Sequence, residues 1–196
     1  MLIKKMPLVA LALLIATPSL ALAHPGHGVH GFGQGLLHPL SGLDHLLAIV
    51  AISLLAVRAG GRSLWALPLS FMACCAVGGL LAAAGIALPM VELTIAASVL
   101  VGGVLLARGQ AVPTLAMAVL PLFGVAHGYA HIHELANMSA VASYSSGIVL
   151  ASALLMGVTI GIAKLAQRQE SAQVWTSVSR VIGSGMAVAA LLMLAL

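Results

Sequence analysis

Charged side chains are scarce in this sequence of 196 residues. Asp, Glu, Lys and Arg together make up 6% of it, whereas hydrophobic residues make up 62% and the mean hydropathy is +1.17. A soluble domain carries about 25% charged residues, which keep its surface in contact with water. The scarcity excludes an ordinary soluble protein and predicts a chain that lies within a lipid bilayer.

Cysteine and runs of basic residues are also nearly absent. The only cysteines, Cys74 and Cys75, are adjacent in an apolar segment, where they can scarcely form an ordinary disulfide, so we interpret them as packing residues. The formal net charge is +4, but no run of basic residues could follow a phosphate backbone. Nucleic acid is therefore excluded as a partner, and lipid is expected instead.

The N-terminus has the three parts of a secretory signal peptide. Lys4 and Lys5 form a basic start, residues 8–22 form an apolar centre, and Ala21-Leu22-Ala23 is a cleavage site of the A-x-A type. We therefore expect residues 1–23 to be removed and residues 24–196 to form one domain that begins outside the cytoplasm. The alternative is an uncleaved first helix.

Six apolar segments follow, bounded by polar residues or by proline and glycine. They are residues 39–57, 64–88, 91–107, 112–133, 140–163 and 175–196. About 20 helical residues cross a bilayer, and lipid offers no partners to exposed backbone groups. The sequence predicts an all-α membrane protein with six transmembrane helices in one bundle. Gly78-Gly79 and Gly102-Gly103 favour close helix packing, and Gly157 and Gly161 fit either such packing or an oligomer contact.

The basic residues of the expected mature chain all fall on one side of the membrane. If residue 24 is periplasmic, the loops after the first, third and fifth spans are cytoplasmic. These loops and the adjoining helix ends contain Arg58, Arg62, Arg108, Lys164, Arg168 and Arg180. The positive-inside rule therefore predicts a multi-pass protein of the bacterial inner membrane with both mature termini in the periplasm.

The histidines show the opposite distribution. All eight lie in the periplasmic part of the expected topology or in the outer half of a span: His24, His27, His30, His38, His45, His127, His131 and His133. Ionisable groups within a membrane are costly and usually face a cavity or one another. The distribution predicts a functional site in the outer half of the bundle.

One cluster, His38, Asp44 and His45, stands at the start of the first span. The seven-residue spacing of the two histidines would place them on one face of a continuous helix. Because the residue before a proline avoids helical geometry, we expect Pro39 to be the first helical residue and His38 a cap that folds over the site. Asp44 either binds an ion or holds an imidazole in its ligating tautomer.

The other cluster, His127, His131 and Glu134, stands at the end of the fourth span. Its i, i+4, i+7 spacing predicts a single helix face, with His127 at the depth of His45. Imidazole and carboxylate ligands suit Ni²⁺, Co²⁺ and Zn²⁺. Two such clusters at one depth predict a binding site for a transported divalent ion. Five further residues are candidates to collect the ion on its way in: His24, His27, His30, Glu92 and His133.

Both clusters resemble motifs of the HupE/UreJ family of hydrogenase and urease accessory membrane proteins. The family motif H-x5-D-H is met by His38, Asp44 and His45. The motif F-H-G-x-[AV]-H-G-x-E is met by His127, Gly128, Ala130, His131 and Glu134, with departures at Ala126 and Ile132. The signal peptide, the histidine-rich mature start and the six spans extend the likeness over nearly the whole chain.

The resemblance implies a permease that supplies nickel, or in some relatives cobalt, to hydrogenase- or urease-type metalloenzymes, and no catalytic activity. Two other interpretations start from the same ligands. One is an intramembrane zinc-dependent hydrolase, although the sequence has no H-E-x-x-H motif. The other is an accessory protein that hands on or senses a metal, although the sequence has no soluble output domain.

Overall fold

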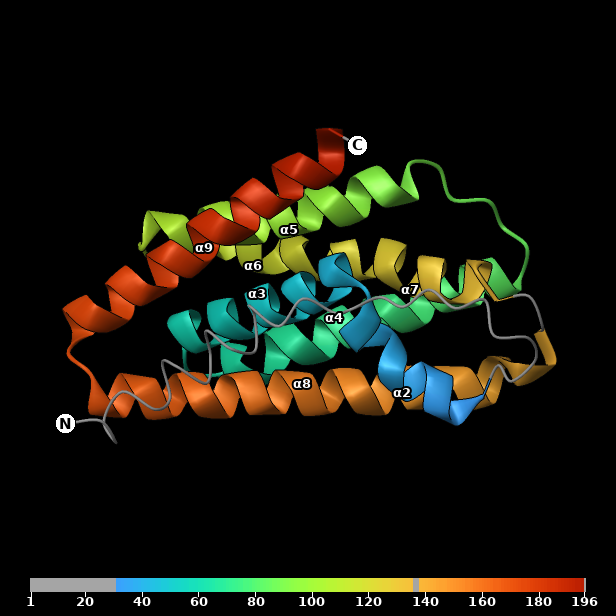
Figure 1. Cartoon of the computed structure of the whole chain (residues 1–196), viewed down its shortest axis with the longest axis horizontal. Helices are drawn as coiled ribbons and strands as arrows, with labels where there is room; N and C mark the ends of the chain where they lie inside the picture. The colour runs from blue at the N-terminus through green and yellow to red at the C-terminus, as the bar shows by residue number, and fades with distance from the viewer. Residues whose placement is uncertain (1–30, 136–137, 196) are drawn as a thin grey trace.

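The regular secondary structure of the described residues is entirely helical (Figure 1). The computed structural model describes residues 31–135 and 138–195, so the predicted signal peptide and His24, His27 and His30 lie outside the described residues. The helices are α2 (Phe32–Ser41), α3 (Leu43–Ala59), α4 (Ser63–Ala83), α5 (Val91–Arg108), α6 (Thr114–Val119), α7 (Gly124–His133), α8 (Val141–Gln169) and α9 (Ala172–Ala195), with 3₁₀ turns η2 (Leu120–Phe123) and η3 (Met138–Ala140).

Five segments are long and apolar enough to cross a membrane: α4, α5, α8, α9 and the composite Thr114–His133, which joins α6, η2 and α7. The bent pair of α2 and α3 makes a sixth if it counts as one span. Large apolar side chains cover the outside of the bundle; Trp65 and Leu80 are each 70% exposed, as expected of groups that face lipid. The prediction of an all-α, multi-pass membrane protein is confirmed.

Helix α3 forms the centre of the bundle. Every residue from His45 to Val57 is buried, and the helix is apolar around its whole circumference, as expected of a helix enclosed by others. Ser53 fits this setting because its hydroxyl donates to the carbonyl of Ile49 at 2.7 Å. The first turn of this enclosed helix carries Asp44 and His45, so the sequence places both within the bundle.

Three closely packed helix pairs surround α3, and each pair is built on a glycine from both partners. The pairs are α2 with α8 through Gly35 and Gly147, α4 with α7 through Gly78 and Gly128, and α5 with α9 through Gly103 and Gly183. A Cβ atom at any of these positions would collide with backbone of the partner helix, which explains why glycine stands there. Each helix pair carries a candidate site residue: His38 is on α2, His127 and His131 are on α7, and Glu92 is on α5.

Two other sequence features behave differently. Gly157 and Gly161 are exposed, and no described atom lies within 4 Å of a Cβ built at either position, so they take no part in packing within the described chain. Ile132, where the family motif has glycine, is buried against Gly79, whose added Cβ would lie 3.2 Å from Ile132 Cγ1. The family motif has a small residue on α7 at this contact. In this chain the small residue is Gly79 on α4, which makes room for Ile132.

The first span differs from the expected helix over residues 39–57. Pro39 lies inside α2, and the chain bends by 78° between α2 and α3 at Gly42, whose backbone is extended (φ −89°, ψ 113°). Packing of Gly35 against α8 stabilises a helix on the N-terminal side of the proline, where local preference disfavours one. His38 is consequently on a separate short helix and is not the cap of α3.

The basic residues gather at the opposite end of the bundle from the histidines. In Figure 1, the ends of α3, α5 and α8 and the start of α9 lie toward one end, and α2 and the end of α7 lie toward the other. Arg58 donates from Nη1 to the carbonyls of Leu105 and Leu106 at 2.9 and 3.0 Å, and from Nη2 to Ser179 Oγ at 2.6 Å. Arg58 thereby caps the C-terminus of α5 and joins three helices.

Candidate metal-binding site

Three imidazole rings from three helices meet in the histidine end of the bundle. One ring nitrogen from each of His38, His45 and His131 lies within 4.8 Å of the other two. The ring centroids are 4.5 Å apart for His45 and His131, and 4.7 Å apart for His38 and His131. The bend at Gly42 turns α2 back against α8 and allows His38 to approach a ring that belongs to α7.

Two nitrogens at this meeting point are buried and have no hydrogen-bond partner among the described residues: His45 Nε2 and His131 Nδ1. A buried polar atom without a partner costs about 1–3 kcal/mol, and such atoms are uncommon in folded proteins. Metal coordination would satisfy a ring nitrogen that holds a lone pair. The arrangement therefore suits a divalent ion with imidazole ligands.

Asp44 determines which nitrogen of His45 is available. Asp44 Oδ1 lies 2.8 Å from His45 Nδ1 and also accepts from the backbone N–H of His45 at 2.7 Å. Because an ionised carboxylate can only accept, Nδ1 carries the ring hydrogen and Nε2 keeps its lone pair. Of the two roles left open by the sequence, the geometry matches the one in which Asp44 orients an imidazole.

His127 lies beside this group and has its own hydrogen-bond partner. Its ring centroid is 4.9 Å from that of His45, and its Nε2 is 2.9 Å from Ser98 Oγ on α5. Ser98 donates its hydroxyl hydrogen to the carbonyl of Ile95 at 2.6 Å. With that hydrogen used, His127 Nε2–H donates to the serine and leaves Nδ1 as the lone-pair nitrogen.

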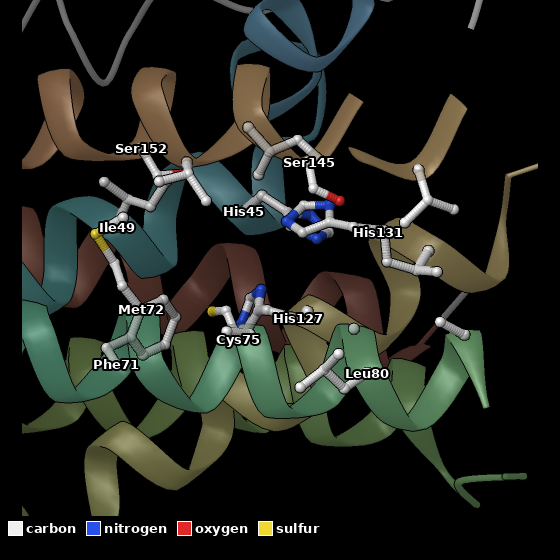
Figure 2. A pocket seen from close by; sticks show the side chains of 18 of the residues that line it. His45, Ile49, Phe71, Met72, Cys75, Leu80, His127, His131, Ser145 and Ser152 are labelled. Carbon is white, nitrogen blue, oxygen red and sulfur yellow. The ribbon is translucent and has the colours of Figure 1, made fainter. Parts of the chain in front are cut away.

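Three of the imidazoles face a cavity of about 320 Å³ between α3, α4, α7 and α8. His45, His127 and His131 line it together with Ser145 and Ser152 from α8, and the remaining lining is mostly apolar. Figure 2 shows the His45 and His131 rings together at the cavity, which His127 and Cys75 also line. An ion in this cavity could therefore reach the imidazoles from inside the bundle.

The remaining acidic candidates lie outside the three-ring group. Glu92, in the first turn of α5, is exposed and lines a second cavity of about 400 Å³ together with Asp44. Glu134 follows the last residue of α7. Partial burial raises the pKa of its carboxyl, and the charge of Glu92 also raises it, whereas His45 lowers it by less than burial raises it. His133 is exposed and stacks on Tyr129 with ring centroids 5.2 Å apart.

Two polar residues near the imidazoles were not candidates from the sequence. Ser98 is buried in α5, where a lone serine in an apolar segment usually bonds to its own helix. Tyr144, from α8, has its hydroxyl oxygen 2.7 Å from His38 Nδ1; the sequence supports an interhelical hydrogen bond for it or a place in a pore lining. Only the position of α5 beside the imidazoles identifies Ser98, and only the position of α8 shows that His38 is the partner of Tyr144.

Comparison with known proteins identifies the family to which the chain belongs. The family described as HupE / UreJ protein matches residues 11–193. Protein HupE of Rhizobium leguminosarum bv. viciae is 41% identical over 176 residues, which cover 89% of this chain and 90% of that protein. No solved structure matches the chain. On the family match and this identity, the chain belongs to the HupE/UreJ family.

Proposed function

We propose that this protein is an inner-membrane permease that moves nickel or cobalt ions from the periplasm to the cytoplasm and supplies hydrogenase- or urease-type metalloenzymes. The observation that carries the proposal is a pair of buried nitrogens beside His38, His45 Nε2 and His131 Nδ1, which have no partner in residues 31–135 and 138–195. Both atoms lie where three helices meet. A ligand that binds there would remove the free-energy cost of leaving them buried without a partner. No catalytic step is part of the proposal.

The ligand chemistry supports a transported ion rather than a permanently bound one. Three imidazoles fill only part of the coordination shell of a divalent ion, and no carboxylate or thiolate is among these three donors. Asp44 is the nearest anion, and its carboxylate is engaged by His45. Incomplete coordination allows release of the ion after binding.

The charge distribution supports the direction of transport. The positive-inside rule places the arginine end in the cytoplasm and the histidine end in the periplasm. Asp44 and Glu92 then line a cavity that faces the incoming ion, with Glu134 and His133 nearby. His24, His27 and His30 are proposed to collect the ion at the periplasmic surface. Anionic groups at the mouth raise the local concentration of a cation.

Uptake of radioactive nickel and cobalt into cells that lack their own importers tests the proposal. We expect expression of the chain to restore uptake, and expect His45→Ala and His131→Ala to abolish it while the protein remains in the membrane. His133→Ala should cause only a mild loss, because His133 is exposed and stacks only on Tyr129 among the described rings. Cys74→Ala is the control at a residue with no proposed role in transport. Tight binding of either metal without any uptake would instead indicate an accessory or sensor protein.

A further inference from the structure

We propose that Tyr144 is a positioning residue that makes His38 the adjustable ligand of the metal site. The inference rests on the proposed metal-binding function and assigns a role to a residue outside both sequence motifs. Tyr144 is 6% exposed, and its hydroxyl oxygen lies 2.7 Å from His38 Nδ1. The two rings meet edge to face, with centroids 5.7 Å apart.

The position of the hydroxyl is determined by backbone contacts. A Cβ atom on Gly35 would collide with the carbonyl of Tyr144, so the backbones of α2 and α8 touch at the residue that carries the hydroxyl. The backbone N–H of Phe32 donates to Ser143 Oγ at 2.9 Å and holds the start of α2 to the same turn of α8. His38 lies one turn beyond Gly35, within reach of Tyr144.

The hydrogen bond leaves Nε2 as the nitrogen that His38 can offer to an ion. For Nε2 to hold a lone pair, Nδ1 must carry the ring hydrogen and donate it to the phenol oxygen of Tyr144. If the phenol instead donates to Nδ1, the ring hydrogen is on Nε2 and His38 cannot bind the ion. Tyr144 therefore selects between a ligating and a non-ligating form of His38.

The contrast with Asp44 shows why this ligand is adjustable. A carboxylate only accepts, so the hydrogen bond from His45 Nδ1 to Asp44 keeps His45 Nε2 ready for metal. A phenol both donates and accepts, so His38 changes between its two forms when the hydroxyl rotates and the ring hydrogen moves. One permanent and one adjustable imidazole would let the site bind an ion and then loosen its hold on it.

Metal binding by the purified full-length chain, with Co²⁺ and Ni²⁺ as probes, tests the role of the hydroxyl. Tyr144→Phe should weaken binding by about 10- to 100-fold, as for other groups that orient metal ligands. X-ray absorption should show one imidazole fewer around the metal at saturation. Tyr129→Phe is the matched control, since Tyr129 is equally buried and stacks on His133, outside the three-ring group.

A double-mutant comparison separates positioning from a general structural effect. On a His38→Ala background, Tyr144→Phe should cause no further loss of affinity, because the ring that it positions is gone. A further loss of similar size would overturn the proposal. So would wild-type affinity and an unchanged imidazole count in Tyr144→Phe. If the wild-type chain binds neither metal, the proposed function itself fails, which is a distinguishable result.

A third measurement changes the hydroxyl without removing it, and it applies even if Tyr144→Phe does not fold. In the Tyr129→Phe background, Tyr144 is the only tyrosine, so fluorotyrosine incorporated by the cell labels that ring alone. Fluorine makes the phenol a weaker acceptor with little change of size. Affinity should fall from tyrosine to monofluorotyrosine to difluorotyrosine, and equal affinities for the three would overturn the proposal.

Discussion

The two ends of the bundle differ in whether the described residues provide hydrogen-bond partners for their ionisable side chains. At the arginine end, Arg58 shares its hydrogens among two carbonyls of α5 and Ser179, and Arg180 Nε donates to the carbonyl of Ala107 at 3.1 Å. At the histidine end, His45 Nε2 and His131 Nδ1 have no partner in the part of the chain that the structure describes. Among the described residues, the arginine end therefore satisfies its hydrogen-bonding groups, whereas the histidine end leaves two buried ring nitrogens unsatisfied.

The difference separates structural groups from functional groups. A guanidinium that caps helix carbonyls removes the cost of its own burial and of theirs, so it stabilises the fold. An imidazole nitrogen with no partner contributes no such stability and is expected where a ligand supplies the missing contact. Ionisable residues in a membrane protein can thus be sorted by whether the fold satisfies them.

The largest effect on transport is expected from the unpartnered nitrogens. His45→Ala or His131→Ala should reduce metal uptake to background. The unfolding midpoint of His131→Ala should stay the same or rise, because a buried atom without a partner among the described residues is removed, whereas His45→Ala also loses the hydrogen bond to Asp44. Uptake and thermal unfolding of the same preparations check this. A strongly destabilised His131→Ala protein would show that the histidine end is structural as well.

Arg58 should give the converse result. Arg58→Met leaves the carbonyls of Leu105 and Leu106 and the hydroxyl of Ser179 without that donor, and each lost partner costs about 1–3 kcal/mol. We expect less folded protein but normal uptake per folded molecule. Arg108→Met is the matched control, because Arg108 is exposed and bonds only to Gln110 among the described partners. Loss of uptake per folded molecule would break the contrast between the two ends.

Smaller effects are expected from the carboxylates at the mouth. Glu92→Gln and Glu134→Gln should raise the metal concentration needed for half-maximal uptake and leave the maximal rate nearly unchanged. Their influence is electrostatic, so the difference from wild type should shrink as salt is added. Glu170→Gln, at the end of α8, is the control at the other end of the bundle. A salt-independent loss of maximal rate would make Glu92 or Glu134 a ligand.

Single cysteines introduced into two exposed loops should leave uptake unchanged, and their reaction with a thiol reagent should identify the two sides of the membrane. In a chain with Cys74 and Cys75 replaced by alanine, we expect a cysteine at Ala87 to react with an impermeant thiol reagent in intact cells. A cysteine at Gln110 should react only after the cells are opened. Both positions are exposed in loops at opposite ends of α5. The reverse pattern would reverse the orientation and the direction of transport proposed here.

Much of the membrane architecture could be predicted from composition and spacing. The apolar segments had to become helices, because backbone groups in lipid have no other partners. The prediction for α5 agrees with the structure to within one residue, and α8 extends six residues beyond its predicted end at 163. Arg168 and Gln169 continue that helix because it leaves the apolar layer without a proline or glycine to end it.

The site was only partly predictable. Ligand chemistry and helical periodicity selected the histidines at 38, 45, 127 and 131 because few other residues in these spans can hold a divalent ion. The family resemblance reached the same residues through its motifs. Neither could show that the chain bends at Gly42, since the helix before Pro39 is stabilised by packing against α8.

By itself, the sequence determined that the chain lies in a membrane, that its basic and histidine residues separate, and which side chains can bind a metal. The tertiary structure decided the partners: Asp44 for His45, Ser98 for His127 and Tyr144 for His38. Two of these three bonds join residues on different helices, 29 and 106 positions apart along the chain. Local spacing describes one helix at a time, whereas hydrogen bonds between helices depend on how the helices pack, as where Gly35 and Gly147 bring α2 and α8 close enough for the bond between His38 and Tyr144.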